Sequence, residues 1–166
     1  MARVYLSLGS NVQPQRYLPA AVAELRQRFG ALSVSPAYRS KAVGFEGADF
    51  VNLAVGLDTD LAPAALNDWL HGLEDRHGRR RDVPRYADRT LDLDIVFYDD
   101  LIIDGPGHLQ IPRNELKHAF VLRPIADIAP DFRHPLSGQR MAELWHAFPA
   151  EREPLQLDQS LDLTRV

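Results

Sequence analysis

The sequence contains no cysteine, so it can form neither a disulfide framework nor a zinc site with thiolate ligands. No apolar run approaches the roughly 18 residues that a membrane-spanning helix needs, and residues 1–11 lack the apolar stretch and cleavage site of a signal peptide. The 166 residues are 45% hydrophobic and 25% charged, which is ordinary for a globular protein and excludes a disordered chain. We therefore expect one cytoplasmic, monomer-sized domain over residues 1–166 with a sizeable core.

Several motifs that would identify common enzyme classes are also missing. There is no Gly-x-x-x-x-Gly-Lys-Ser/Thr loop and no Gly-x-Gly-x-x-Gly loop for nucleotide phosphates. The absence of His-Glu-x-x-His removes the support for zinc hydrolysis, and the absence of Gly-x-Ser-x-Gly weakens a serine hydrolase interpretation. If the protein binds a nucleotide, it must therefore use other residues.

The basic residues are nearly all arginines, with very few lysines. The formal net charge is −4, which argues against a protein whose main task is to coat nucleic acid. Only Lys41 and Lys117 are lysines, so 17 of the 19 basic residues are arginines. Five arginines lie close together, namely Arg79, Arg80, Arg81, Arg85 and Arg89. Because the planar guanidinium group binds phosphate oxygens bidentately, this cluster predicts a local anion site.

Hydrophobic periodicity predicts an α+β domain. Strand patterns cover residues 3–8, 32–40, 50–59 and 91–98. Helical spacing covers residues 15–29 and the stretch between a cap at Thr59 or Asp60 and a stop at Gly78. The resulting β-α-β-β-α-β order is the ferredoxin-like arrangement, with two helices on one face of an antiparallel sheet.

The remainder of the chain adds smaller elements to this core. We expect a short hairpin near residues 108–111 and helical stretches near residues 114–128 and 141–148. The polar tail after Pro149 is interpreted as an irregular or weakly ordered strand. Neither a repeat nor a convincing linker divides the sequence, so we expect a single domain.

The fourth predicted strand carries the most informative pattern. Leu91, Leu93, Ile95 and Phe97 share one face and belong to the core by this pattern, whereas Asp92 and Asp94 share the opposite face. Residues two apart on a strand are about 6.6 Å apart, so the two carboxylates can approach each other. Like charges this close repel unless a cation lies between them, and oxygen ligands of this kind suit Mg²⁺.

Acidic residues on a strand are also common on a solvated face, and an isolated Asp-x-Asp would favour that simpler interpretation. Here the five-arginine segment runs directly into the acidic strand. Carboxylates that hold Mg²⁺ beside arginines that hold phosphates form the arrangement that phosphoryl transfer needs. The combination therefore favours a metal-dependent phosphoryl-transfer site.

The residues in this order resemble one family, the 6-hydroxymethyl-7,8-dihydropterin pyrophosphokinases. The matching pieces are Leu-Gly-Ser-Asn at 8–11, Phe-Val-Asn at 50–52, Glu74 with Gly78-Arg79, Arg85-Tyr86, Arg-Thr-Leu-Asp-Leu-Asp at 89–94, and Ala-Phe-Val-Leu-Arg-Pro at 119–124. They run from the first strand through the helix after residue 111. The arginine and Asp-x-Asp segment is the specific part, because Leu-Gly-Ser-Asn alone is a common turn.

The resemblance implies that ATP donates pyrophosphate to the hydroxymethyl oxygen of a reduced pterin, releasing AMP, with two Mg²⁺ ions bound by Asp92 and Asp94. Arg79 and Arg89 would stabilise the triphosphate and the transferring group. The implied ATP contacts are Glu74, Arg81 and Arg85, and the implied pterin contacts are Ser40, Val43, Asn52, Tyr86 and Phe120. Arg113 departs from the family pattern but would still supply a cation for ATP. ATP and the pterin would be the partners of a monomer, without nucleic acid or a membrane.

Departures from the family pattern concentrate on the ATP side. Ala87-Asp88 replaces the usual Gly-Pro, Arg113-Asn114 stands where a histidine is common, and His118 stands where arginine is common. A divergent pterin-binding relative, with altered substrate or without transfer activity, therefore remains an alternative. Phe120 is also explained equally well as a core residue. An RNA-binding domain of the same element order is disfavoured, because the first and third strands lack its aromatic pattern.

Overall fold

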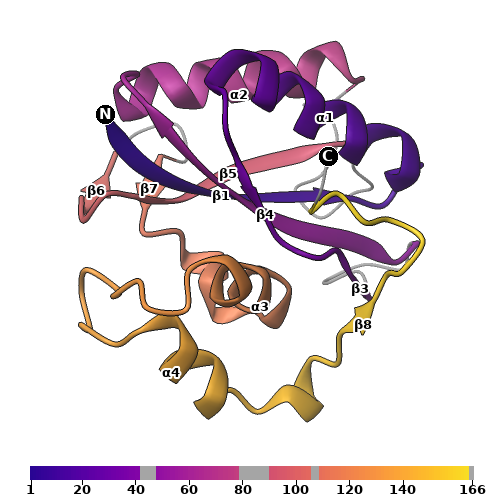
Figure 1. Ribbon diagram of the computed structural model, residues 1–166. Helices are drawn as coiled ribbons and strands as arrows, with labels where there is room; N and C mark the ends of the chain where they lie inside the picture. The colour runs from indigo at the N-terminus through magenta and orange to yellow at the C-terminus, as the bar shows by residue number, and fades with distance from the viewer. Residues whose placement is uncertain (42–47, 79–89, 106–108, 165–166) are drawn as a thin grey trace.

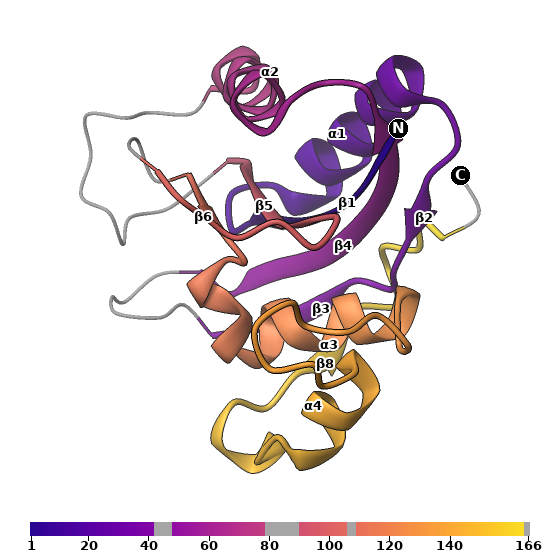
Figure 2. The ribbon, with the colours of Figure 1, turned by 90° about the vertical axis from the view of Figure 1, so that its left-hand side faces the viewer.

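The computed structural model describes residues 1–41, 48–78, 90–105 and 109–164. A central antiparallel sheet has helices α1 and α2 on one face and α3, followed by α4, on the other (Figures 1 and 2). The strands are β1 (Ala2–Ser10), β2 (Ser33–Val34), β3 (Tyr38–Ser40), β4 (Phe50–Thr59), β5 (Asp92–Tyr98), β6 (Ile103–Asp104), β7 (Gln110–Ile111) and β8 (Gln156–Leu157). The helices are α1 (Pro14–Phe29), α2 (Pro63–Arg76), η1 (Asn114–Lys117), α3 (Ala119–Ile128), α4 (Met141–Ala147) and η2 (Ala150–Arg152).

The main sheet has the order β5-β1-β4-β3-β8, with β2 also paired to β4. Every pairing in it is antiparallel, and β1 lies between β5 and β4. The predicted α+β class and the β-α-β-β-α-β order of the core are therefore confirmed. None of the helices in the described ranges is long and apolar enough to cross a membrane.

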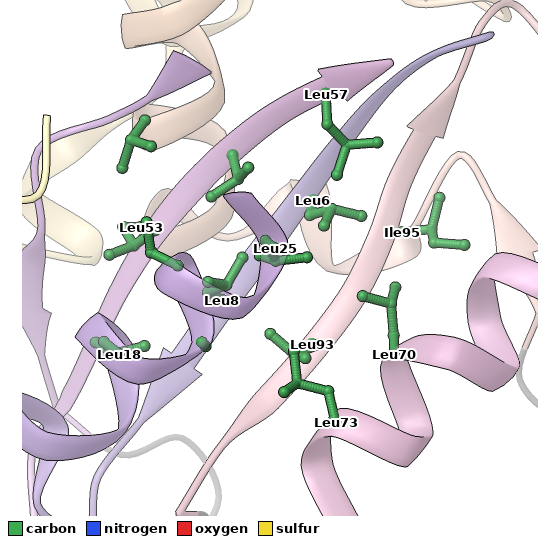
Figure 3. Packing of buried hydrophobic residues seen from close by; sticks show 14 of the residues in the cluster. Leu6, Leu8, Leu18, Leu25, Leu53, Leu57, Leu70, Leu73, Leu93 and Ile95 are labelled. Atoms are coloured by element: carbon green, nitrogen blue, oxygen red, sulfur yellow. The ribbon is translucent and has the colours of Figure 1, made fainter. Parts of the chain in front are cut away.

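Helices α1 and α2 form where the apolar spacing predicts them. The buried residues of α1 are Leu18, Ala21, Val22 and Leu25, which recur at helical spacing on the face toward the sheet. The helix is followed by Gly30, whose φ of 83° suits glycine and ends the helix. Helix α2 starts at Pro63 and buries Leu66, Leu70 and Leu73. Figure 3 shows side chains of both helices meeting those of β1, β4 and β5.

The prediction of one continuous strand over residues 32–40 is wrong, because the structure has two short strands there. β2 and β3 are separated by Ser35, Pro36 and Ala37. Pro36 has no N–H to donate to a sheet. At this break the Ser35 hydroxyl accepts a hydrogen bond from the Ala54 N–H at 2.8 Å, and the Ser35 N–H donates to the Ala54 carbonyl at 2.9 Å. Serine therefore keeps the chain attached to β4 where regular pairing stops.

The prediction that Phe97 shares one face of the strand with Leu91, Leu93 and Ile95 is also wrong. Leu6 pairs with Ile95 and Tyr5 pairs with Phe97, so Val96 is an extra residue in β5. Such a β-bulge reverses the alternation of side chains beyond it. Phe97 consequently packs with the cluster under α3, whereas Ile95 belongs to the cluster under α1 and α2.

The C-terminal segment covers the edge of the sheet more regularly than the sequence predicts. β8 pairs with β3, the Arg39 guanidinium lies 2.8 Å from the Asp158 carboxylate, and Leu161 and Leu163 are buried in the cluster under α1 and α2. The predicted hairpin forms between β6 and β7. The predicted helical stretches correspond to η1 with α3, and to α4.

Candidate active site

The two acidic residues of β5 lie on the face of the sheet that α3 covers. Asp92 pairs with Gly9 of β1, and Asp94 pairs with Ser7. Ser7 and Gly9 alternate with Tyr5, which packs in the cluster under α3, so all three point to that face. Both aspartates are partly buried. The structure therefore brings together the pair that the sequence predicts as metal ligands.

Gly9 connects this acidic pair to the predicted pterin side. On the other side of β1, Gly9 pairs with Asn52 of β4. Residues directly opposite in neighbouring strands share a face, so Asp92, Gly9 and Asn52 form a row across three strands. Two strand spacings separate Asp92 from Asn52, which is about 10 Å between Cα atoms. This row is the floor of the candidate site.

Glycine at position 9 leaves the space above it to the Asn52 amide. A Cβ on Gly9 would lie 2.6 Å from Nδ2 of Asn52, which is closer than real Cβ contacts. In the sequence Gly9 belongs to the Leu-Gly-Ser-Asn motif of the family resemblance and is otherwise interpreted as part of a strand-ending turn. The signal that could have identified it is a glycine inside a strand, which often marks a close approach.

The carboxyl group of Asp94 is in an environment that disfavours its charge. Burial and the neighbouring Asp92 carboxylate raise the pKa of Asp94 well above its usual value, with smaller contributions in the same direction from Glu74 and Glu115. Arg113 opposes them, since its Nη2 lies 3.3 Å from Oδ1 of Asp94. A group of acids this close together favours the binding of a cation.

Arg113 is held between two acids. Its Nε lies 2.9 Å from Oε2 of Glu115, and its backbone N–H donates to the Val96 carbonyl at 3.1 Å. The sequence predicts Arg113 as a cation for ATP, and the structure places it beside the metal candidates. The contact with Glu115 is not predicted from the sequence, although an acid two residues after an arginine is a usable signal for an ion pair.

Glu74, predicted to border the nucleotide, approaches the same acids from α2. Its side chain is buried, and its Oε2 accepts a hydrogen bond from the Leu93 N–H at 2.7 Å. Leu93 lies between Asp92 and Asp94 in β5, which is an edge strand of the sheet. Glu74 therefore satisfies a backbone donor of the edge and fixes the backbone that carries the two aspartates.

Two predicted pterin contacts carry buried polar atoms with no hydrogen-bond partner among the described residues. They are Oδ1 of Asn52 and Oγ of Ser40. Asn52 pairs with Tyr38 of β3, and Ser40 lies two residues further along the same strand, so both side chains share the face under α3. A buried acceptor without a partner costs about 1–3 kcal/mol. The two atoms are therefore well suited to bind polar groups of a ligand.

Phe120 lies at the start of α3, partly buried against the cluster beneath that helix. Its ring is stacked on the His118 ring, with centroids 5.0 Å apart and an angle of 11° between the planes. Both roles foreseen for Phe120, in the core and at a ligand, are compatible with this position. The other predicted site residues lie outside the described residues; they are Val43, Arg79, Arg81, Arg85, Tyr86 and Arg89.

The donor set fits a divalent cation that is shared with phosphate. Within the described ranges, no group of three or more His, Asp or Glu side chains is arranged to hold a metal ion. Mg²⁺ usually takes one or two carboxylates and completes its coordination with water and substrate phosphates. Asp92 and Asp94 meet that requirement, because they offer adjacent carboxylates in a group of acids.

Comparisons with known proteins identify the family of this chain. A family model described as 7,8-dihydro-6-hydroxymethylpterin-pyrophosphokinase (HPPK) matches residues 5–130. A 2-amino-4-hydroxy-6-hydroxymethyldihydropteridine pyrophosphokinase of Pseudomonas aeruginosa is 41% identical over 154 residues, which cover 90% of this chain and 93% of the relative. The protein of the same name from Haemophilus influenzae is 35% identical over 95% of this chain and 99% of the relative.

A solved structure of wild-type HPPK-DHPS from Plasmodium falciparum with pteroate resembles the fold, with a TM-score of 0.69 at 12% identity. The match covers 87% of this chain but 44% of that longer chain, so it concerns the fold of one part of it. The resemblance of the sequence motifs is thus confirmed by the family match and by the relatives. This chain belongs to the 7,8-dihydro-6-hydroxymethylpterin-pyrophosphokinase family.

Proposed function

We propose that this protein transfers pyrophosphate from ATP to the hydroxymethyl group of 6-hydroxymethyl-7,8-dihydropterin in folate biosynthesis, giving AMP and the pterin diphosphate. One observation carries the proposal beyond the family match. The acidic pair and the Asn52 amide oxygen, which has no hydrogen-bond partner in the described part of the chain, lie on one face of the sheet, on either side of Gly9. A phosphate-binding half and a ring-binding half therefore adjoin each other.

The reaction itself needs little acid–base chemistry. The pterin hydroxyl oxygen attacks the β-phosphorus, a new P–O bond forms, the bond from that phosphorus to the AMP oxygen breaks, and the hydroxyl proton is released. Catalysis of such a step depends on positioning and on neutralising the charge of the phosphates. The arrangement of acids and arginines in this chain supplies both requirements.

The phosphate half is assigned to the end of β5 and its surroundings. Asp92 and Asp94 would hold two Mg²⁺ ions, whose charge would neutralise that of the phosphate oxygens. Arg113 contributes a guanidinium beside Asp94, and Glu74 keeps the backbone between the two aspartates in place. The remaining assignments follow the family motif: Arg79 and Arg89 stabilise the transferring group, and Arg81 and Arg85 bind the triphosphate.

The pterin half is assigned to β3, β4 and the start of α3. Oδ1 of Asn52 accepts a hydrogen bond from the amide-like edge of the pterin, and Oγ of Ser40 binds a second polar group; both atoms are buried and lack partners among the described residues. Phe120 stacks on the ring, as flat heteroaromatic ligands prefer. By the family motif, Val43 and Tyr86 complete the pocket.

The protein works as a monomer in the cytoplasm, with ATP and the reduced pterin as its partners and without nucleic acid or a membrane. The alternative is a divergent relative that binds the pterin but has altered or lost transfer activity. The observation in its favour is Ala87-Asp88, because in the sequence an acidic residue directly precedes Arg89, which is assigned to the transferring group.

The test is to incubate the protein with ATP, Mg²⁺ and 6-hydroxymethyl-7,8-dihydropterin and to follow AMP, with each component omitted in turn. The proposal expects AMP formation that requires both the pterin and Mg²⁺. Saturable pterin binding without AMP would instead identify the divergent binding protein. Absence of both binding and AMP would overturn the pterin assignment itself.

A further inference from the structure

A carboxylate from the C-terminal segment reaches the start of α3. Glu153 directly follows η2 and lies beyond the region that the family model matches. Its Oε1 accepts a hydrogen bond from the Ala119 N–H at 3.0 Å, and both carboxylate oxygens lie 3.2 Å from Nδ1 of His118. Because the first N–H groups of a helix have no partner within the helix, Glu153 caps α3 from 34 residues away.

The same carboxylate fixes the ring of His118. His118 has an extended backbone, with φ −97° and ψ 144°, and immediately precedes α3. The contact with Glu153 uses Nδ1, so it sets the rotation of the imidazole as well as its position. The imidazole then stacks on Phe120 at 11° between the planes. A chain of three side chains thus runs from the C-terminal segment to the aromatic ring of the site.

This contact is not needed to attach the C-terminal segment. Downstream of Glu153, the segment is held by the pairing of β8 with β3 and by the Arg39–Asp158 ion pair. Leu161 and Leu163 are also buried in the cluster under α1 and α2. Attachment therefore has its own contacts, and the approach of Glu153 to His118 calls for a separate explanation.

We infer that Glu153 and His118 are positioning residues for the pterin, because they clamp the Phe120 ring from the side away from the ligand. This inference rests on the proposed function of Phe120. His118 covers one face of the Phe120 ring, so a planar ligand must meet the ring on the other side. A ring held in one orientation binds such a ligand better than a ring that has to be ordered on binding. His118 replaces a residue on the ATP side of the family pattern, but its ring contact in this chain is with Phe120. The clamp should therefore act on pterin affinity and leave ATP affinity unchanged.

The experiment compares Glu153→Ala with Glu151→Ala in the full chain. Glu151 is an exposed acid on η2 and serves as the matched control. We expect Glu153→Ala to raise the dissociation constant and the KM for the pterin about three- to tenfold, the effect of one or two lost hydrogen bonds. The ATP KM and kcat should change less than about twofold. Glu151→Ala should change none of these constants.

A mutant cycle with His118→Gln tests whether Glu153 acts through the imidazole. The double variant should bind the pterin no more weakly than the weaker of the two single variants, because both remove the same clamp. Glu153→Gln should restore most of the affinity, because the amide oxygen can still accept from the Ala119 N–H. Thermal unfolding of every variant reports whether the fold is retained.

The inference is overturned if Glu153→Ala folds and binds the pterin as the parent does, or if pterin and ATP affinity fall together. If Glu153→Ala does not fold, unchanged pterin affinity in His118→Gln overturns it instead, and a selective loss of pterin affinity supports it. Failure of the proposed function is a different result, because the parent protein itself would then not bind the pterin.

Discussion

Nη2 of Arg113 lies 3.3 Å from Oδ1 of Asp94, so one acid of the candidate metal pair already faces a cation of the protein. The side chains are 19% and 28% exposed, which leaves both within reach of a ligand. The contact joins a residue assigned to ATP with a residue assigned to Mg²⁺. It therefore provides a direct test of the phosphate half of the site.

Replacing Arg113 by alanine should raise the KM for ATP about 10- to 100-fold, because charge-assisted hydrogen bonds to the triphosphate are lost. Arg113→Lys should recover part of this loss, since the charge returns without the planar fork. Steady-state kinetics with varied ATP measures the change. Arg140→Ala is the control, because Arg140 also pairs with two acids but lies at the start of α4. Equal ATP KM values for the Arg113 and Arg140 variants would contradict the assignment.

Asp94→Asn should lower turnover by at least about 100-fold without unfolding the protein. The substitution keeps the shape of the side chain but removes the charge that binds metal. Since burial and Asp92 both disfavour that charge, the variant should be as stable as the parent or more stable. AMP formation measures turnover, and thermal unfolding without nucleotide measures stability. An active Asp94→Asn enzyme would remove Asp94 from the metal site.

Asn52→Leu should lower pterin affinity without lowering the stability of the fold. Leucine has a similar size, and it removes the buried Oδ1 that has no partner among the described residues. We expect the free energy of unfolding to stay the same or rise by about 1 kcal/mol, while pterin affinity falls at least about tenfold. Chemical denaturation and equilibrium pterin binding measure the two quantities. A variant that loses stability but binds the pterin normally would show that Asn52 is structural.

Gly9→Ala should weaken pterin binding by displacing the Asn52 amide, whose Nδ2 would lie 2.6 Å from the new Cβ. The crowding should also cost about 1–3 kcal/mol of stability. Gly72→Ala is the control in α2, where the nearest atom is Nη1 of Arg76 at 3.5 Å and a helical alanine should add about 0.5–1 kcal/mol. If Gly9→Ala binds the pterin like the parent, Asn52 does not need its observed position.

Asp158 should make a pH-dependent contribution to stability. Burial opposes its charge, but hydrogen bonds from Ser160 and the guanidinium of Arg39 hold the pKa of Asp158 below its ordinary value of 3.8. Its stabilisation is therefore complete above that value and is lost as the pH falls through the lower pKa of the folded protein. Asp158→Asn should reduce Tm at pH 7, and the difference from the parent should shrink toward pH 3. Asp131→Asn serves as the control, because Asp131 is an exposed acid outside this contact.

Elements with a local pattern are predicted well from this sequence. The alternation of Val51, Leu53, Val55 and Leu57 identifies β4 with its observed bounds. Phe97 is misplaced because the extra residue at Val96 is set by the pairing of β5 with β1, which a local pattern does not report. For the same reason Pro36 indicates an irregular strand but not its division into β2 and β3.

The candidate site divides in the same way. Asp92 and Asp94 are predicted together because their spacing along one strand places them on one face. Asn52 and Asp92 both pair with Gly9, and this proximity follows only from the registers of three strands. The approach of Glu153 to His118 joins residues 35 apart and has no local signal at all.

The position of β1 between β5 and β4 has a mechanical consequence. The nucleotide and the pterin are assigned to opposite sides of a strand that pairs with a neighbour along both edges. The sheet therefore sets the distance between the two substrates. Heating or mild denaturant should loosen peripheral contacts well before this spacing changes. With rising temperature or denaturant, substrate affinity should therefore fall before the spacing between the two bound substrates changes.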